Sequence, residues 1–229
     1  MLYNIIRYIM ETKKYNFLTI GFDCSPASAL RELDLREYAL PFDWIESNIR
    51  ALERCFADNF ARFHTGLRIS PSRTRIIDVY GFQYPHDYPV IDENNNEPTS
   101  AIVEKKIVEN WKLYYDDIKR KYNRRIDRFI QIMRSPLPIL VLCRYSVDDT
   151  LKIRGMLNKY YNKSNVMFIT STKTVSNVPY VRTLFTEKND IWNETAIWKE
   201  AVDSILTNPN WTNVFNRNMG RHLQRLIIR

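Results

Sequence analysis

Short apolar runs alternate with helix-like repeats along most of this chain. Residues 15–22 (YNFLTIGF), 138–145 (PILVLCRY) and 165–172 (NVMFITST) are nearly continuous apolar runs, the pattern of strands that are covered on both faces. Between the last two runs, Ser146 can cap a helix with a repeating apolar face. This order predicts a β-α-β unit with parallel strands.

The first apolar run leads into a turn and a helix. Pro26 favours the start of a helix, so we predict Ser25 as its N-cap. Cys24 would then lie just outside the helix N-terminus, at the carboxyl end of the first strand. Open α/β sheets bind their ligands at that edge. The alternative is a small buried cysteine without chemistry.

Three- and four-residue apolar repeats predict further helices. One follows the sequence PFDW and opens with Asp43 and Glu46 in capping-box spacing; another occupies residues 103–133. The polar stretch 61–102 between them is predicted to be an irregular insertion with a strand near residues 75–80.

The pattern predicts one α/β domain over residues 1–229. A further strand is expected at 178–185 and a helix at 194–206. The central sheet should be parallel or mixed and flanked by helices, which is a Rossmann-like three-layer arrangement.

Composition excludes several classes of function. Only 5 of the 229 residues are glycines, and their spacing excludes the glycine-rich loops that bind nucleotide phosphates. No cysteine and histidine spacing indicates a metal site, so we expect no metal and no cofactor. The three separate cysteines favour a reducing, cytoplasmic compartment, and we expect neither a signal peptide nor a membrane span.

The net charge of +8 is concentrated in two segments. Residues 103–134 carry ten basic and five acidic residues, and residues 217–229 carry four arginines and no acid. Arg217, Arg221 and Arg225 recur every four residues, so a helix would align them. Such a row could bind nucleic acid or an acidic protein.

Cysteine chemistry requires a base near the thiol. The chain has three histidines, His64, His86 and His222, and His86 stands out because it precedes Asp87 in the aromatic sequence FQYPHDY. Adjacent strand residues point to opposite faces, so Asp87 need not contact the His86 ring.

Five motifs occur in order over roughly residues 17–170: IGFDC, PFDW, FQYPHDY, KYNRRIDRF and LVLCRY. They resemble a domain family described as papain-like cysteine peptidases, with members in bacteria, some eukaryotes and large DNA viruses. The resemblance implies Cys24 as the nucleophile and His86 as the general base, with Asp87 or Asp43 orienting the imidazole. The substrate would be a peptide, an amide or an ester. The predicted parallel β-α-β unit departs from the antiparallel sheet of papain-like folds.

Other assignments compete with this one. Asp43 can be explained as a helix cap alone. Arg144 follows the strand at the same edge as Cys24 and could pair with Asp23, Asp43 or Asp87 or bind a substrate anion. We take Arg144, Asp23 and Trp44 as candidate substrate-binding residues.

A non-enzymatic binding or structural protein, such as a viral one, is the main alternative to the hydrolase, and phosphoester or glycan chemistry is a third possibility.

Overall fold

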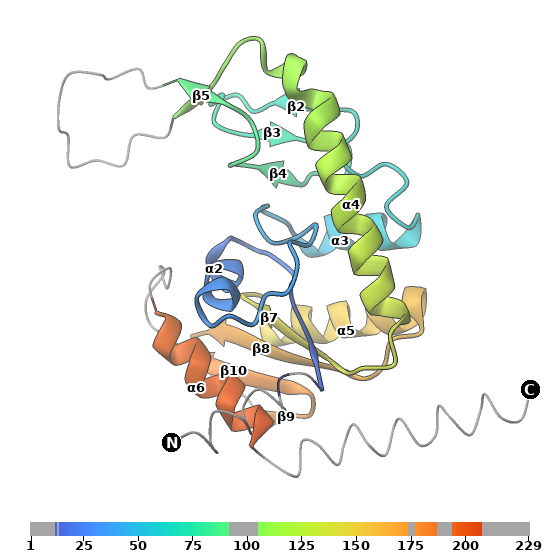
Figure 1. Cartoon of the computed structure of the whole chain (residues 1–229), viewed down its shortest axis with the longest axis vertical. Helices are drawn as coiled ribbons and strands as arrows, with labels where there is room; N and C mark the ends of the chain where they lie inside the picture. Colours follow the sequence, from blue (N-terminus) through green and yellow to red (C-terminus); the bar gives the residue numbers. More distant parts are fainter. Residues whose placement is uncertain (1–11, 13, 92–104, 174–176, 187–193, 208–229) are drawn as a thin grey trace, which may run out of the picture.

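The fold is α/β, built on a parallel four-stranded sheet flanked by helices (Figure 1). The computed structural model describes residues 12, 14–91, 105–173, 177–186 and 194–207. The central sheet has the order β1 (Asn16–Thr19), β7 (Ile139–Cys143), β8 (Val166–Thr172), β10 (Val181–Phe185) and β9 (Asn177–Val178). The first four strands are parallel, and β9 is antiparallel to β10. The predicted strands and the parallel β-α-β unit are confirmed.

Helices cover both faces of this sheet. One core packs α2 (Ser25–Glu32) and α6 (Thr195–Leu206) against the sheet, and the other packs α3 (Ile49–Ala57), α4 (Tyr115–Arg134) and α5 (Val147–Tyr161) against it. Side chains of β7 alternate between the two cores, as expected for a strand buried on both faces. Ser146 caps α5 as predicted, because its hydroxyl accepts the Asp149 N–H.

The described part of the insertion contains regular structure. It forms a small antiparallel sheet of β2 (Arg68–Ile69), β3 (Ile76–Ile77) and β4 (Gln83–Tyr84), beside the pair β5 (Val90–Ile91) and β6 (Lys106–Ile107). The helix predicted over 103–133 starts later than expected, with the short 3-10 helix η1 (Trp111–Tyr114) before α4. Residues 106–108 instead form backbone hydrogen bonds with the insertion. Helix α4 then runs from the small sheet to the central sheet (Figure 1).

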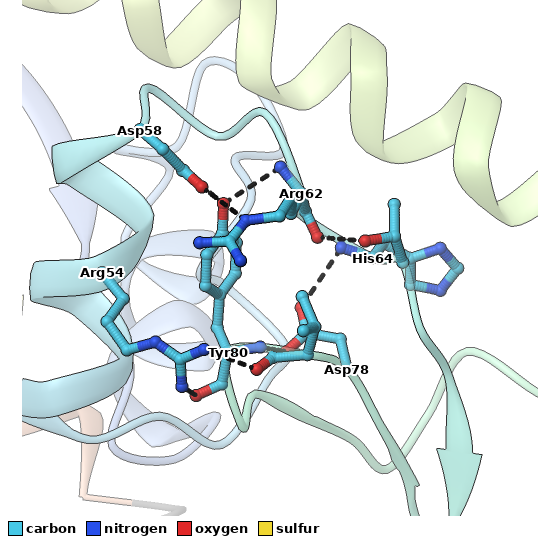
Figure 2. Close-up of polar contacts among 8 residues, drawn as sticks. Arg54, Asp58, Arg62, His64, Asp78 and Tyr80 are labelled. Atoms are coloured by element: carbon cyan, nitrogen blue, oxygen red, sulfur yellow. Dashed lines mark hydrogen bonds and ion pairs between the residues drawn. The ribbon is translucent and has the colours of Figure 1, made fainter.

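Two carboxylates, those of Asp78 and Asp58, organise the turns of the insertion (Figure 2). Asp78 is buried and accepts hydrogen bonds from the backbone N–H groups of His64, Tyr80, Gly81 and Phe82 and from the Tyr84 hydroxyl. Asp58 accepts from the Tyr80 hydroxyl and from Arg62. These bonds satisfy polar groups that the short strands leave unpaired, so the insertion has a defined shape.

The helix predicted directly after PFDW begins later than expected. Helix α3 starts at Ile49, and the Asn48 side chain caps it by accepting the Ala51 N–H at 2.9 Å. Glu46 instead exchanges two backbone hydrogen bonds with Gln83, at 2.9 and 3.0 Å. The predicted capping box is therefore wrong, because this segment pairs with β4 before the helix begins.

The PFDW loop passes directly against the end of β1 at Gly21. A Cβ atom on Gly21 would lie 2.6 Å from the Phe42 carbonyl oxygen and 2.9 Å from that of Ile45. The Gly21 carbonyl accepts hydrogen bonds from the Ser47 and Tyr145 hydroxyls. Gly21 thus joins β1, the PFDW loop and the end of β7.

Gly21→Ala should destabilise the protein by about 1–3 kcal/mol, because neither carbonyl can move away without breaking this junction. Gly155 is the matched control: it lies within α5, and a Cβ there meets nothing within 4 Å. Gly155→Ala should therefore stabilise the protein by about 0.5–1 kcal/mol. Urea unfolding measures both, and an unchanged midpoint for Gly21→Ala would contradict the close approach.

Candidate active site

Cys24 lies at the junction of β1 and α2. It is itself the N-cap residue of α2, one position before the predicted Ser25, and its side chain makes no capping hydrogen bond. Asp23 binds the first turn instead, because its carboxylate accepts the Ser25 N–H at 2.9 Å and the Ser25 hydroxyl at 2.7 Å. Cys24 is only 5% exposed.

The surroundings of Cys24 keep its thiol protonated. Burial is the largest cause that raises the pKa of Cys24 to about 12, and the carboxylates of Asp23, Glu46 and Asp87 add to it. Arg75 acts in the opposite direction. At neutral pH the resting sulfur is therefore a neutral thiol.

His86 provides a neutral imidazole. Desolvation lowers the pKa of His86, with Arg75 acting in the same direction, while Asp87 and Glu46 oppose the shift. Its ring meets the edge of Trp44, with the ring centres 6.5 Å apart and the planes at 82°. A neutral imidazole can accept a proton, as a general base must.

The same charged groups act on Cys24 and on His86. Glu46 and Arg75 form an ion pair of 2.9 Å, and both of them, together with Asp87, perturb the pKa of the thiol and of the imidazole. Within the described residues, no hydrogen bond joins the thiol to a histidine.

Trp44 contacts both the histidine and the helix that follows the cysteine. Its ring contacts His86 on one side, and the guanidinium groups of Arg31 and Arg36 lie 5.4 and 5.7 Å from its centre. Arg31 belongs to α2, the helix that Cys24 begins. The PFDW loop thus lies between the cysteine helix and the histidine.

Neither candidate third group hydrogen-bonds to the His86 imidazole in the described structure. Asp87 binds Lys121 and Tyr122 of α4. Asp43 is 1% exposed and accepts from the Thr19 hydroxyl at 2.8 Å and the Leu40 N–H at 2.9 Å. Burial raises the pKa of Asp43, and these bonds oppose the shift.

Arg144 lies at the same sheet edge as Cys24. Strands β1 and β7 are parallel neighbours, so Arg144, directly after β7, reaches Asp23 and forms an ion pair with it. Of the three carboxylates considered from the sequence, Asp23 is the one that the structure pairs with Arg144.

The remaining sequence candidates lie elsewhere. His64 is fully buried among tyrosines, and its Nε2 meets the Tyr88 hydroxyl at 3.0 Å. Arg217, Arg221 and Arg225 lie outside the described residues, as does His222. In the basic segment of α4, Lys119 donates to the Phe63 carbonyl and Arg120 pairs with Asp117, so part of its charge is used internally.

The sequence did not identify the residues whose contacts join the separate segments of the candidate site. From the sequence, Glu46 is predicted to cap a helix, Arg75 lies at the start of a predicted strand, and Tyr122 lies within the helix predicted over residues 103–133. Among the residues that the structure describes, no group of three His, Cys, Asp or Glu side chains could hold a metal ion. In the same part of the chain, no helix is both long and apolar enough to cross a membrane.

Comparisons with known proteins agree with the motifs. A family described as "Putative papain-like cysteine peptidase (DUF1796)" matches residues 15–208, which confirms the resemblance. The "Uncharacterized protein R408" of Acanthamoeba polyphaga mimivirus is 26% identical, over 70% of this chain and 78% of its own length. No solved structure matches the chain significantly.

Alkylation of Cys24 by iodoacetamide should rise about tenfold per pH unit between pH 7 and 9, because the thiolate is the reacting form and remains scarce until about pH 12. Peptide mapping separates Cys24 from Cys55 and Cys143, the buried internal controls. A rate for Cys24 that levels off below pH 8 would contradict the neutral thiol.

Proposed function

Since the chain belongs to the family described as "Putative papain-like cysteine peptidase (DUF1796)", we propose that it is a cysteine-dependent hydrolase of a peptide, an amide or an ester. Cys24 is the nucleophile and His86 the general base. The observation that carries the proposal is that Trp44 contacts both the His86 ring and Arg31 of α2, the helix that begins at Cys24. All three cysteines are free, which suits a reducing cytoplasm.

With a neutral thiol and a neutral imidazole at rest, the proposed hydrolase would act by general-base catalysis. A neutral thiol and a neutral imidazole can exchange one proton when the substrate binds and the two groups come within about 3 Å. The Cys24 proton passes to His86 as the sulfur attacks the substrate carbonyl carbon, which forms the C–S bond. The helix N-terminus at Cys24 lies beside the developing negative charge and would stabilise it.

The second half of the reaction returns the enzyme to its starting state. The His86 imidazolium gives its proton to the leaving amine or alcohol as the C–N or C–O bond breaks. Water then attacks the thioester and gives a proton to His86. The acid leaves, and the proton returns to the Cys24 sulfur.

The neighbouring side chains would serve binding and orientation. Trp44 supplies an aromatic surface beside His86, and we propose it as a substrate contact. Arg144 and Asp23 lie next to Cys24, where a substrate carboxylate could compete with Asp23 for the guanidinium. Asp87 and Asp43 would act through the elements that they hold in place.

The burial of Cys24 favours a second proposal, a binding or structural protein without catalysis. Its contact with nucleic acid or an acidic protein would use Arg217, Arg221 and Arg225. In that case heparin binding should weaken steeply with salt, and replacing these arginines by alanine should abolish it. Cys24 would then be dispensable.

Acetyl transfer from p-nitrophenyl acetate tests the hydrolase proposal. The wild-type protein should release nitrophenolate in a burst and carry the acetyl group on Cys24. Cys24→Ala should lose the burst, and His86→Gln should slow acylation by about a hundredfold or more, because proton transfer then lacks its base.

Cys55→Ala is the control, since Cys55 is also a buried free thiol but lies in α3. It should keep the burst. A burst that persists in Cys24→Ala, or an acylation rate that is the same in His86→Gln, would contradict the assignment.

A further inference from the structure

The loop that carries His86 is fastened to α4 through Asp87. The Asp87 carboxylate is only 5% exposed, and consecutive residues of α4 bind its two oxygens. Lys121 pairs with Oδ1, and the Tyr122 hydroxyl donates to Oδ2 at 2.5 Å. These contacts join positions 34 and 35 residues apart in sequence.

We propose that Tyr122 and Lys121 are positioning residues, which hold Asp87 and thereby keep His86 against Trp44 and directed toward the Cys24 edge of the sheet. The proposal rests on the proposed function, because it assigns these residues to the same site. It gives Asp87 the role of an anchor for the loop.

The contacts of the two neighbouring side chains support this role. Asp87 binds α4, whereas the His86 ring lies at Trp44. Residues 85–88 form bends outside the strands, so side-chain contacts rather than a strand ladder hold this part of the loop. Upstream, the backbone bonds between Gln83 and Glu46 fix the same loop, so His86 is held from both sides.

Tyr122 is suited to donate a hydrogen bond to Asp87 over a wide range of pH. It is fully buried, and burial together with the Asp87 charge raises the pKa of Tyr122 far above its ordinary value. Its hydroxyl therefore stays protonated throughout the range in which His86 titrates. Hydrogen bonds to ionised acceptors are also stronger than neutral ones.

The titration of His86 reports on the contacts that Asp87 makes with Lys121 and Tyr122. Asp87 from its own loop and Glu46 raise its pKa, whereas Arg75 and desolvation, which is the largest cause, lower it. His86 is an exposed residue whose ring is still partly desolvated, so a loosened loop would remove the remaining desolvation and raise the pKa of His86 toward the ordinary value of 6.5.

Tyr122→Phe tests the proposal, because it keeps the buried ring and removes the hydroxyl. We expect amide exchange over residues 86–88 to accelerate roughly fivefold. The pKa of His86, followed by NMR of the imidazole, should rise, and acetylation of Cys24 should slow. The matched control is Tyr80→Phe, which removes the bond from another buried tyrosine hydroxyl to a carboxylate, that of Asp58 (Figure 2). The control should leave all three measurements unchanged.

A second pair of variants covers the case in which Tyr122→Phe does not fold. Lys121→Met should accelerate amide exchange over residues 86–88, whereas Lys119→Met, on the same helix but bound to the Phe63 carbonyl, should not. The proposal is overturned if exchange and His86 titration match the wild type in Tyr122→Phe, or if Tyr80→Phe changes them equally. If the His86 titration shifts in Tyr122→Phe but Cys24 is never acetylated even in the wild-type protein, the positioning role of Tyr122 and Lys121 is supported and the hydrolase proposal is contradicted.

Discussion

The close approach of two backbone segments at Gly21 is the constraint on which the site depends. The carbonyl groups of Phe42 and Ile45 occupy the space that a Cβ atom would need. The Gly21 carbonyl in turn binds Ser47 and Tyr145. This single position brings the cysteine turn, the PFDW loop and the end of β7 together.

The electrostatics of the site follow from that junction. Each carboxylate that acts on Cys24 has a basic partner: Asp23 pairs with Arg144, Glu46 with Arg75 and Asp87 with Lys121. The thiol therefore lies among balanced charges, and burial decides its pKa. In the proposed mechanism, a neutral Cys24 and a neutral His86 would carry out hydrolysis by transferring a proton at the moment of attack.

Local patterns in the sequence predicted the central sheet well. Strands β7 and β8 and the cap at Ser146 depend on burial and capping, which neighbouring residues determine. The parallel topology predicted Arg144 at the same edge as Cys24, with Asp23 as one of three possible partners, and the structure pairs it with Asp23. The start of α3 was wrong, because Asp43 binds Thr19 and Leu40 rather than a helix terminus. The pairing of Glu46 with Arg75 and of Asp87 with Tyr122 joins distant segments, and no local pattern predicts such contacts.

Cross-linking tests most directly whether Cys24 and His86 form one catalytic pair. The reagent 1,3-dibromoacetone alkylates a thiol first and then bridges it, through three carbons, to a nucleophile within reach. Digestion and mass spectrometry of the treated protein should recover the peptide of Cys24 joined to that of His86. A Cys24 that is bridged to another side chain, or alkylated without any bridge, would contradict the account.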